Sequence, residues 1–127
     1  MRLLLDTHVL LWALLGSDRL TVGIRRLLED PGDECFVSAA STWEIAIKAG
    51  LGKSPADIDL AGLEEAILAS GFRPLPVTLA HSLAIDGSEL PRCDPFDRLP
   101  LAQCHVETLR LLTADRMLLA SPLAIPA

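Results

Sequence analysis

The chain has 127 residues, 50% of them hydrophobic and 22% charged, with a formal net charge of −6. This size and composition suit one globular domain spanning residues 1–127, and the acidic balance argues against a general nucleic-acid-binding protein. Its three cysteines, Cys35, Cys93 and Cys104, form no CxxC motif, and no apolar run approaches the ~18 residues of a membrane span, so we expect a reduced, cytoplasmic protein.

The first third of the chain alternates apolar runs with turn residues. Arg2 to Asp6 reads as a strand covered on both faces, and Val9 to Leu15 as a short helix that is apolar on every side. Thr21 to Asp30 is amphipathic, and its predicted inward side chains are Val22, Ile24, Leu27 and Leu28. Cys35 to Ser38 reads as a second strand.

The middle and end of the chain repeat this alternation. A helix is expected from about Ala40 to Gly50 or Gly52, capped by Ser38 or Ser41. A helix within Pro55 to Ser70 carries an apolar stripe of Leu60, Leu63, Ile67 and Leu68. The remaining predicted elements are a strand at Phe72–Leu75, a helix at Leu79–Ile85 capped by Thr78, a helix from Asp94-Pro95 to His105, a strand at Leu109–Thr113, a helical turn at Asp115–Leu119 and a strand at Leu123–Ile125.

Strands that alternate with helices throughout predict a three-layer α/β/α sandwich with a mainly parallel sheet of four to five strands. In open sheets of this kind, ligands bind beyond the carboxyl ends of the strands. Residues that follow a strand are therefore the first candidates for a functional site.

Four acidic residues occupy such positions or can reach them: Asp6, Glu44, Asp97 and Asp115. Asp6 ends the first strand and Asp115 follows the fourth, while Asp97 lies in a first helical turn that favours an anion. Glu44 lies among apolar helix neighbours and needs a partner if buried. Clustered carboxylates repel each other unless a divalent cation lies among them, so the set indicates metal-assisted phosphodiester chemistry.

Each acid also has a local structural explanation. Asp6 can cap the helix that follows it, Glu44 can pair with Lys48 at i+4, and Asp115 can be an N-cap. Asp97 in a first helical turn is commonplace. Only the combination of all four favours a shared site.

Several segments resemble the PIN domain, and more narrowly the VapC-type toxins of bacterial toxin–antitoxin pairs. The similar segments are Leu3–Trp12, Val37–Lys48, Asp94–Leu99 with Ala102-Gln103, and Leu112–Asp115. The resemblance spans essentially the whole chain and places the family's four acids on Asp6, Glu44, Asp97 and Asp115. It implies a PIN-like fold, an endoribonuclease dependent on Mg²⁺ or Mn²⁺, a homodimer, and neutralisation by a cognate VapB-type antitoxin.

The chain departs from the family at Pro100, where an aliphatic residue is usual. Pro100 falls in the second turn of its helix, removes one hydrogen bond and is expected to kink the helix near Asp97. Thr7, Ser41 and Thr113 are candidate hydrogen-bond donors to the acids. The side chains that are candidates to touch substrate, each also explicable as an ordinary structural or surface residue, are His8, Lys48, Arg98 and Arg116.

Other functions remain open. A phosphohydrolase with an aspartyl nucleophile at Asp6 generally needs a second Asp two residues on, where this chain has His8. Nucleotide-binding glycine motifs are missing from the sequence. The strongest alternative is a non-catalytic protein-binding module with the same fold, and the apolar segment Val9 to Leu15 suits a protein interface.

Overall fold

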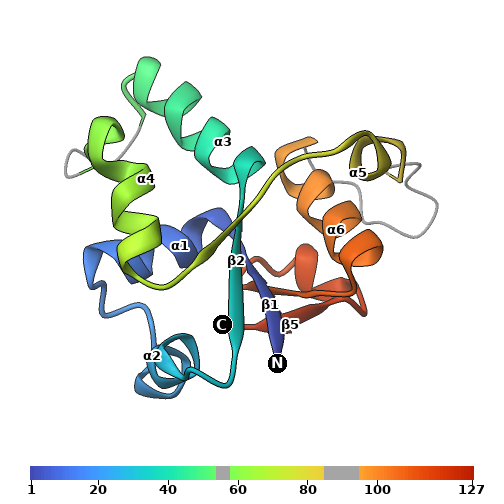
Figure 1. Cartoon of the computed structure of the whole chain (residues 1–127), viewed down its shortest axis with the longest axis horizontal. Coiled ribbons are helices and arrows are strands. Elements are labelled where there is room, and N and C mark those ends of the chain that lie inside the picture. The colour runs from blue at the N-terminus through green and yellow to red at the C-terminus, as the bar shows by residue number, and fades with distance from the viewer. Residues whose placement is uncertain (54–57, 85–94) are drawn as a thin grey trace.

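The computed structural model describes residues 1–53, 58–84 and 95–127. Its strands form one five-stranded sheet in the order β3-β2-β1-β4-β5, and every neighbouring pair is parallel (Figure 1). The strands are β1 (Arg2–Leu5), β2 (Glu34–Ser38), β3 (Arg73–Leu75), β4 (Arg110–Thr113) and β5 (Ala124–Pro126). The expected parallel sheet is confirmed.

Helices fill the connections between the strands. They are α1 (Thr7–Leu15), α2 (Val22–Glu29), α3 (Ala39–Gly50), α4 (Leu60–Ala69), α5 (Leu79–Leu83), α6 (Pro95–Glu107) and the 3₁₀ helix η1 (Leu118–Ala120). In Figure 1, α1 to α4 lie on one side of the sheet, and α5 and α6 lie on the other.

The alternation of side chains along β1 divides the core into two halves. Leu3 and Leu5 belong to one buried cluster, together with residues of α1, α3 and α4. Leu4 points the other way and packs with residues of α6 and η1. Because successive strand residues face opposite sides, a fully apolar strand requires helices on both faces. The three-layer α/β/α prediction is confirmed.

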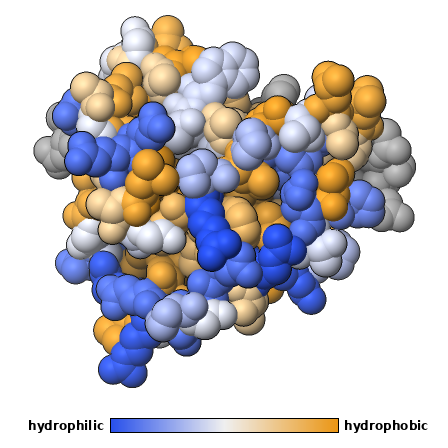
Figure 2. Space-filling model, viewed as in Figure 1, coloured by the Kyte–Doolittle hydropathy of each residue, from blue (hydrophilic) through white to orange (hydrophobic). Residues whose placement is uncertain are grey.

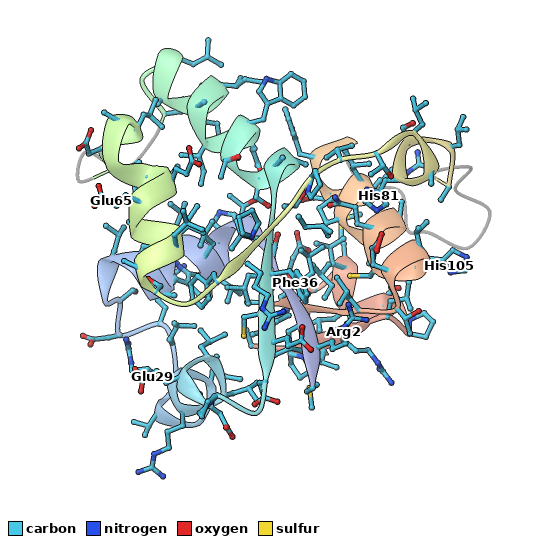
Figure 3. The ribbon with its side chains drawn as sticks, in the orientation of Figure 1. Arg2, Glu29, Phe36, Glu65, His81 and His105 are labelled. Atoms are coloured by element: carbon cyan, nitrogen blue, oxygen red, sulfur yellow. The ribbon has the colours of Figure 1, made fainter. Side chains whose placement is uncertain are left out.

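Side-chain caps fix where the helices begin. Ser38, and not Ser41, caps α3, because its hydroxyl oxygen accepts a hydrogen bond from the Ala40 amide at 3.0 Å. Thr78 caps α5 as predicted, and His81 completes the capping box from inside the helix. In Figure 3, His81 lies where α5 meets α6.

The structure corrects three local expectations. Val22 is 67% exposed rather than inward, because it is the first residue of α2, where the helix end projects into solvent. Leu60 and Leu68 are also exposed, whereas Leu63 and Ile67 of the same stripe are buried. The turn predicted at Asp115–Leu119 instead forms η1, three residues of 3₁₀ helix that begin at Leu118.

Helix α6 continues through Pro100, which lies inside it and is buried. The proline lacks an N–H and so removes one helical hydrogen bond, but the helix runs on to Glu107. The expected helix start at Asp94 and helix end at Ile85 fall outside the described residues. In the part of the chain that the structure describes, no helix is both long enough and apolar enough to cross a membrane.

Candidate functional site

The sheet reverses its strand order between β1 and β4, which pair with each other in the middle of the sheet. Crevices for ligands form at such a switch point, outside the carboxyl ends of the strands. The pairing aligns Leu5 with Leu112, so the residues that follow, Asp6 and Thr113, arrive side by side. Two segments that are far apart in the sequence are therefore neighbours at the switch point of the sheet.

Asp6 is the central side chain of the site and is 6% exposed. Its Oδ1 accepts a hydrogen bond from the Thr7 amide at 2.8 Å, which also makes Asp6 the N-cap of α1. Its Oδ2 accepts a hydrogen bond from the Thr113 hydroxyl at 2.7 Å. The Asp6 carboxylate therefore caps α1 and also lies at the switch point of the sheet.

Burial raises the pKa of Asp6 above its ordinary value of 3.8. The hydrogen bonds from Thr113 and from the Thr7 amide oppose this rise, and His8 opposes it weakly, while the nearby Glu44 carboxylate adds to it. The cause is loss of water around a carboxylate that has another carboxylate nearby. A bound cation would offset the free-energy cost of burying the charged Asp6 carboxylate.

Glu44 reaches the same place from α3. Its Oε1 accepts a hydrogen bond from the Thr7 hydroxyl at 2.7 Å, and its Oε2 lies 2.7 Å from the Lys48 ammonium. Glu44 is 7% exposed, and the local ion pair with Lys48 considered from the sequence is present. Thr7 thus links Asp6 to Glu44, one through its amide and the other through its hydroxyl.

Asp115 joins the network through Thr113. The Asp115 amide donates to the Thr113 hydroxyl at 3.0 Å, and this hydroxyl in turn donates to Asp6. The Asp115 carboxylate is exposed and accepts from the Met117 amide at 2.8 Å, but the N-cap of η1 is Met117, so Asp115 does not take the suggested N-cap position. Asp6, Glu44 and Asp115 therefore belong to one continuous hydrogen-bonded network.

Asp97 is half-buried in the first turn of α6. The helix packs against α3, and its Phe96 ring contacts Trp43 with a centroid separation of 5.5 Å. Phe96 precedes Asp97 and Trp43 precedes Glu44 in the sequence. The aromatic contact therefore brings together the two helices that carry these acids.

The donor set suits a hard divalent cation. Carboxylate and hydroxyl oxygens are the ligands that Mg²⁺ and Mn²⁺ prefer. Ser41 lies one turn before Glu44 on α3 and is 2% exposed, and its hydroxyl has no hydrogen-bond partner within the described part of the chain. Within residues 1–53, 58–84 and 95–127, no three His, Cys, Asp or Glu side chains form a compact metal-binding group, and Thr7, Thr113 and Lys48 contact the carboxylates of Asp6 and Glu44.

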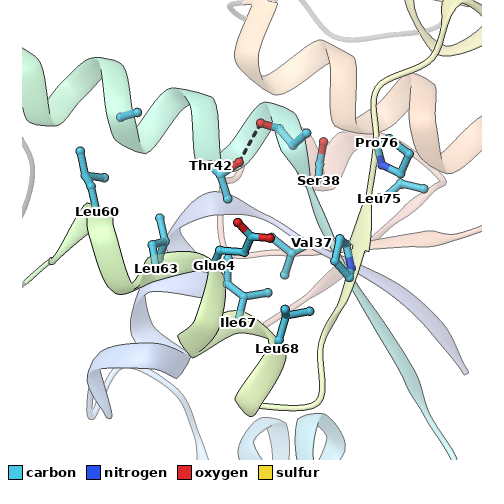
Figure 4. A pocket seen from close by; sticks show the side chains of 13 residues that line it. Val37, Ser38, Thr42, Leu60, Leu63, Glu64, Ile67, Leu68, Leu75 and Pro76 are labelled. Carbon is cyan, nitrogen blue, oxygen red and sulfur yellow. Dashed lines mark hydrogen bonds between the residues drawn. The ribbon is translucent and has the colours of Figure 1, made fainter.

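A hollow of about 420 Å³ lies away from these carboxylates, between α3 and α4 and over the ends of β2 and β3 (Figure 4). Apolar side chains that include Leu60, Leu63, Ile67 and Leu68 form most of its wall. Figure 4 shows the carboxylate of Glu64 directed toward this hollow. The apolar stripe predicted on α4 therefore lines an open hollow, which is why Leu60 and Leu68 are exposed while Leu63 and Ile67 are buried.

One further feature was not singled out from the sequence, and one candidate from the sequence has a local contact. Trp43 is 61% exposed beside Glu44, and its contact with Phe96 joins residues that are remote in the sequence. His8 is exposed and its ring centroid lies 6.2 Å from that of Trp12, which gives it an ordinary packing role.

The fold and site define a parallel, three-layer α/β protein with an acidic network at its switch point. The sequence matches the PIN domain over residues 3–121, and the chain belongs to this family. A comparison with curated proteins found no match.

Two solved structures share the fold. One is described as VapBC2 from Rickettsia felis bound to a DNA fragment from their promoter, with a TM-score of 0.67 and 15% identity, covering 100% of this chain and 98% of that one. The other is described as a toxin–antitoxin complex from Klebsiella pneumoniae. It has a TM-score of 0.65 and 15% identity, and the match covers 96% of this chain and 94% of that one. The match over nearly the full length of both chains confirms the expected PIN-like fold.

Proposed function

We propose that this protein is a metal-dependent endoribonuclease that acts as the toxin of a VapBC-type toxin–antitoxin pair. Membership of the PIN family supports a nuclease, and of the two neighbours in fold one is described as VapBC2 and the other as a toxin–antitoxin complex. The observation that carries the proposal is the network around Asp6, in which Thr7 and Thr113 connect the carboxylates of Asp6 and Glu44 and the backbone amide of Asp115 at the switch point.

In this proposal Asp6, Asp97 and Asp115 hold Mg²⁺ or Mn²⁺, and Glu44 completes the set or serves a second ion. The ion supplies charge neutralisation at the scissile phosphate and a more acidic water. No side chain of the protein has to act as a nucleophile.

The remaining residues position the acids. Thr113 fixes the orientation of Asp6, and Thr7 fixes that of Glu44, each through a 2.7 Å hydrogen bond from its hydroxyl. Such supporting contacts typically contribute about 10- to 100-fold to metal affinity or activity. Lys48 neutralises Glu44 at 2.7 Å and limits the repulsion between Glu44 and Asp6.

The partners follow from the same proposal. The net charge of −6 and the carboxylate of Glu64 in an apolar hollow suit a basic, amphipathic antitoxin segment, and we assign that segment to the hollow between α3 and α4. A homodimer would cover the apolar side of α1, where Leu11, Trp12 and Leu14 are half-buried and Leu15 is 40% exposed. Light scattering that gives only a monomer at high concentration would contradict the dimer.

The test is cleavage of single-stranded RNA by the purified protein, by Asp6→Asn and by Asp97→Asn, in Mg²⁺ and in Mn²⁺. Both variants should lose cleavage, while Asp18→Asn, which changes an exposed acid, should retain it. Wild-type rates in either site variant would overturn the mechanism.

A non-catalytic protein-binding module with the same fold is the alternative. The local roles of the acids, in which Asp6 caps α1 and Glu44 pairs with Lys48, are what such a module would retain. Calorimetric titration with Mn²⁺ separates the two functions, because the enzyme should bind the ion and Asp6→Asn should not. An absence of heat with the wild-type protein would favour the module.

A further inference from the structure

We propose that Trp43 and Phe96 form a stacking platform for one unpaired base of the RNA, beside the acidic network. The inference rests on the proposed nuclease function and adds to it a contact that recognises single-stranded substrate. It starts from an exposed aromatic ring that precedes one acid of the site in the sequence and contacts the ring that precedes another.

The geometry places the pair at the junction of α3 and α6. The two rings meet at a centroid distance of 5.5 Å and an interplanar angle of 63°, an edge-to-face contact that orients each ring. Glu44 follows Trp43 and Asp97 follows Phe96 in the sequence, so each ring is attached one residue from a predicted metal ligand. A base bound on this platform therefore keeps its phosphate close to the carboxylates.

Trp43 differs from the other four Phe and Trp side chains of the protein, all of which the structure describes. Phe72 is buried, and Phe36 lies beneath the Arg2 guanidinium, which is 5.5 Å from its ring centroid (Figure 3). Trp12 is half-buried beneath Arg19. Trp43 alone is exposed, and its 61% exposure has no explanation in the packing of the chain.

The surroundings of Trp43 favour a base over a protein partner. Its neighbours one turn away on the exposed side of α3 are the small residues Ala39 and Ala46, and the next strongly exposed large apolar side chain along the helix is Leu51, two turns further on. The exposed leucines Leu79 and Leu83 lie on α5, which is a separate apolar area in Figure 2. A single flat ring beside a phosphate-handling site suits a nucleobase, because every base presents a π-face.

The expected effect follows from the strength of stacking. Loss of one base–aromatic contact weakens binding by about 5- to 150-fold. Trp43→Ala should therefore raise KM or Kd for single-stranded RNA by this factor, with a smaller change in kcat, because the acids remain in place. Trp43→Phe keeps a stacking surface and should lose much less.

Binding can be observed directly through the ring. In a Trp12→Phe protein, Trp43 is the only tryptophan. Adding Asp97→Asn prevents cleavage during the titration. A short single-stranded RNA should then quench the fluorescence of Trp43, whereas a strand of the same length and charge without bases should not.

The outcomes separate this inference from the proposed function. Cleavage by the wild-type protein, together with an unchanged KM and Kd in Trp43→Ala, would overturn the platform and leave the nuclease intact. Quenching without any cleavage by the wild-type protein would overturn the nuclease and retain the platform. A Trp43→Ala variant that binds RNA normally but loses its oligomeric state in sedimentation would assign the ring to a protein contact and overturn the inference.

Discussion

The hydroxyl of Thr113 donates a hydrogen bond to Oδ2 of Asp6 at 2.7 Å, across 107 positions of the sequence. The same hydroxyl accepts from the amide of Asp115. One threonine therefore orients the central carboxylate of the site and fixes the backbone of another acid.

Replacing Thr113 by Val should break both of these hydrogen bonds while conserving shape. We expect a loss of about 1–3 kcal/mol in the free energy of unfolding, because a buried carboxylate loses a donor. Activity should fall about 10- to 100-fold. Thr113→Ser keeps the hydroxyl and is the matched control, so equal losses in Val and Ser variants would contradict the role of the hydrogen bonds. Chemical denaturation and RNA cleavage measure the two effects.

The raised pKa of Asp6 predicts how stability depends on pH without divalent ions. The folded state binds the proton of Asp6 more tightly than the unfolded state, so this residue favours folding below pH 3.8, the ordinary pKa, and loses that contribution as the pH rises through its folded value. Asp6→Asn cannot ionise and should melt a few degrees above the wild-type protein at neutral pH in EDTA. The difference between the two melting temperatures should disappear in acid, where Asp6 is protonated. Thermal melts across pH measure this difference, and a difference that grows in acid would contradict the prediction.

Divalent ions should reverse the order of the two melting temperatures, so that the wild-type protein melts above Asp6→Asn. At a concentration of 100 times Kd, an ion that binds only the folded state adds about 2.7 kcal/mol to the free energy of unfolding. Mn²⁺ should therefore raise the melting temperature of the wild-type protein and leave Asp6→Asn unchanged, and EDTA should restore the original value. Equal shifts in both proteins would mean that the ion binds elsewhere.

Glu64 and Glu65 are a natural pair for testing the antitoxin assignment. Glu64 lines the hollow between α3 and α4, whereas its neighbour Glu65 is not among the lining residues (Figure 4). We expect Glu64→Arg to weaken capture of the product of a short neighbouring reading frame by at least about tenfold, since charge reversal adds repulsion against a basic segment. Glu65→Arg should bind normally in a co-purification assay, and equal effects of the two changes would point to a general charge effect.

Two of the cysteines are expected to resist thiol reagents. Burial raises the pKa of Cys35 to about 11 and that of Cys104 to about 12, so neither forms the reactive thiolate at neutral pH. In a Cys93→Ser protein, a chromogenic disulfide reagent should therefore react only after denaturant is added. Rapid reaction of the native protein would show that one side of the sheet opens readily.

The fold was predictable because the central strands contain short apolar runs that alternate with helical segments, as in Leu3-Leu4-Leu5. The position of Asp6 beyond a strand was predictable for a related reason, since the end of the first apolar run is visible in the sequence. The sequence does not reveal the register between β1 and β4. The pairing of Leu5 with Leu112 is what places Asp6 beside Thr113. Helix ends were also misjudged, as at Val22, because periodicity does not reveal where neighbouring elements stop covering a helix.

The two central strands come from opposite ends of the polypeptide: β1 begins at Arg2, and β4 ends at Thr113 of 127 residues. During translation, β1 is made early but can pair with β4 only after β4 has been synthesised, although N-terminal segments otherwise fold first. A chain in which β4 has not yet been made therefore lacks the hydrogen bond from Thr113 to Asp6 and has no complete acidic network. For a protein proposed to destroy RNA, a partial chain that stops before this strand is expected to be inactive.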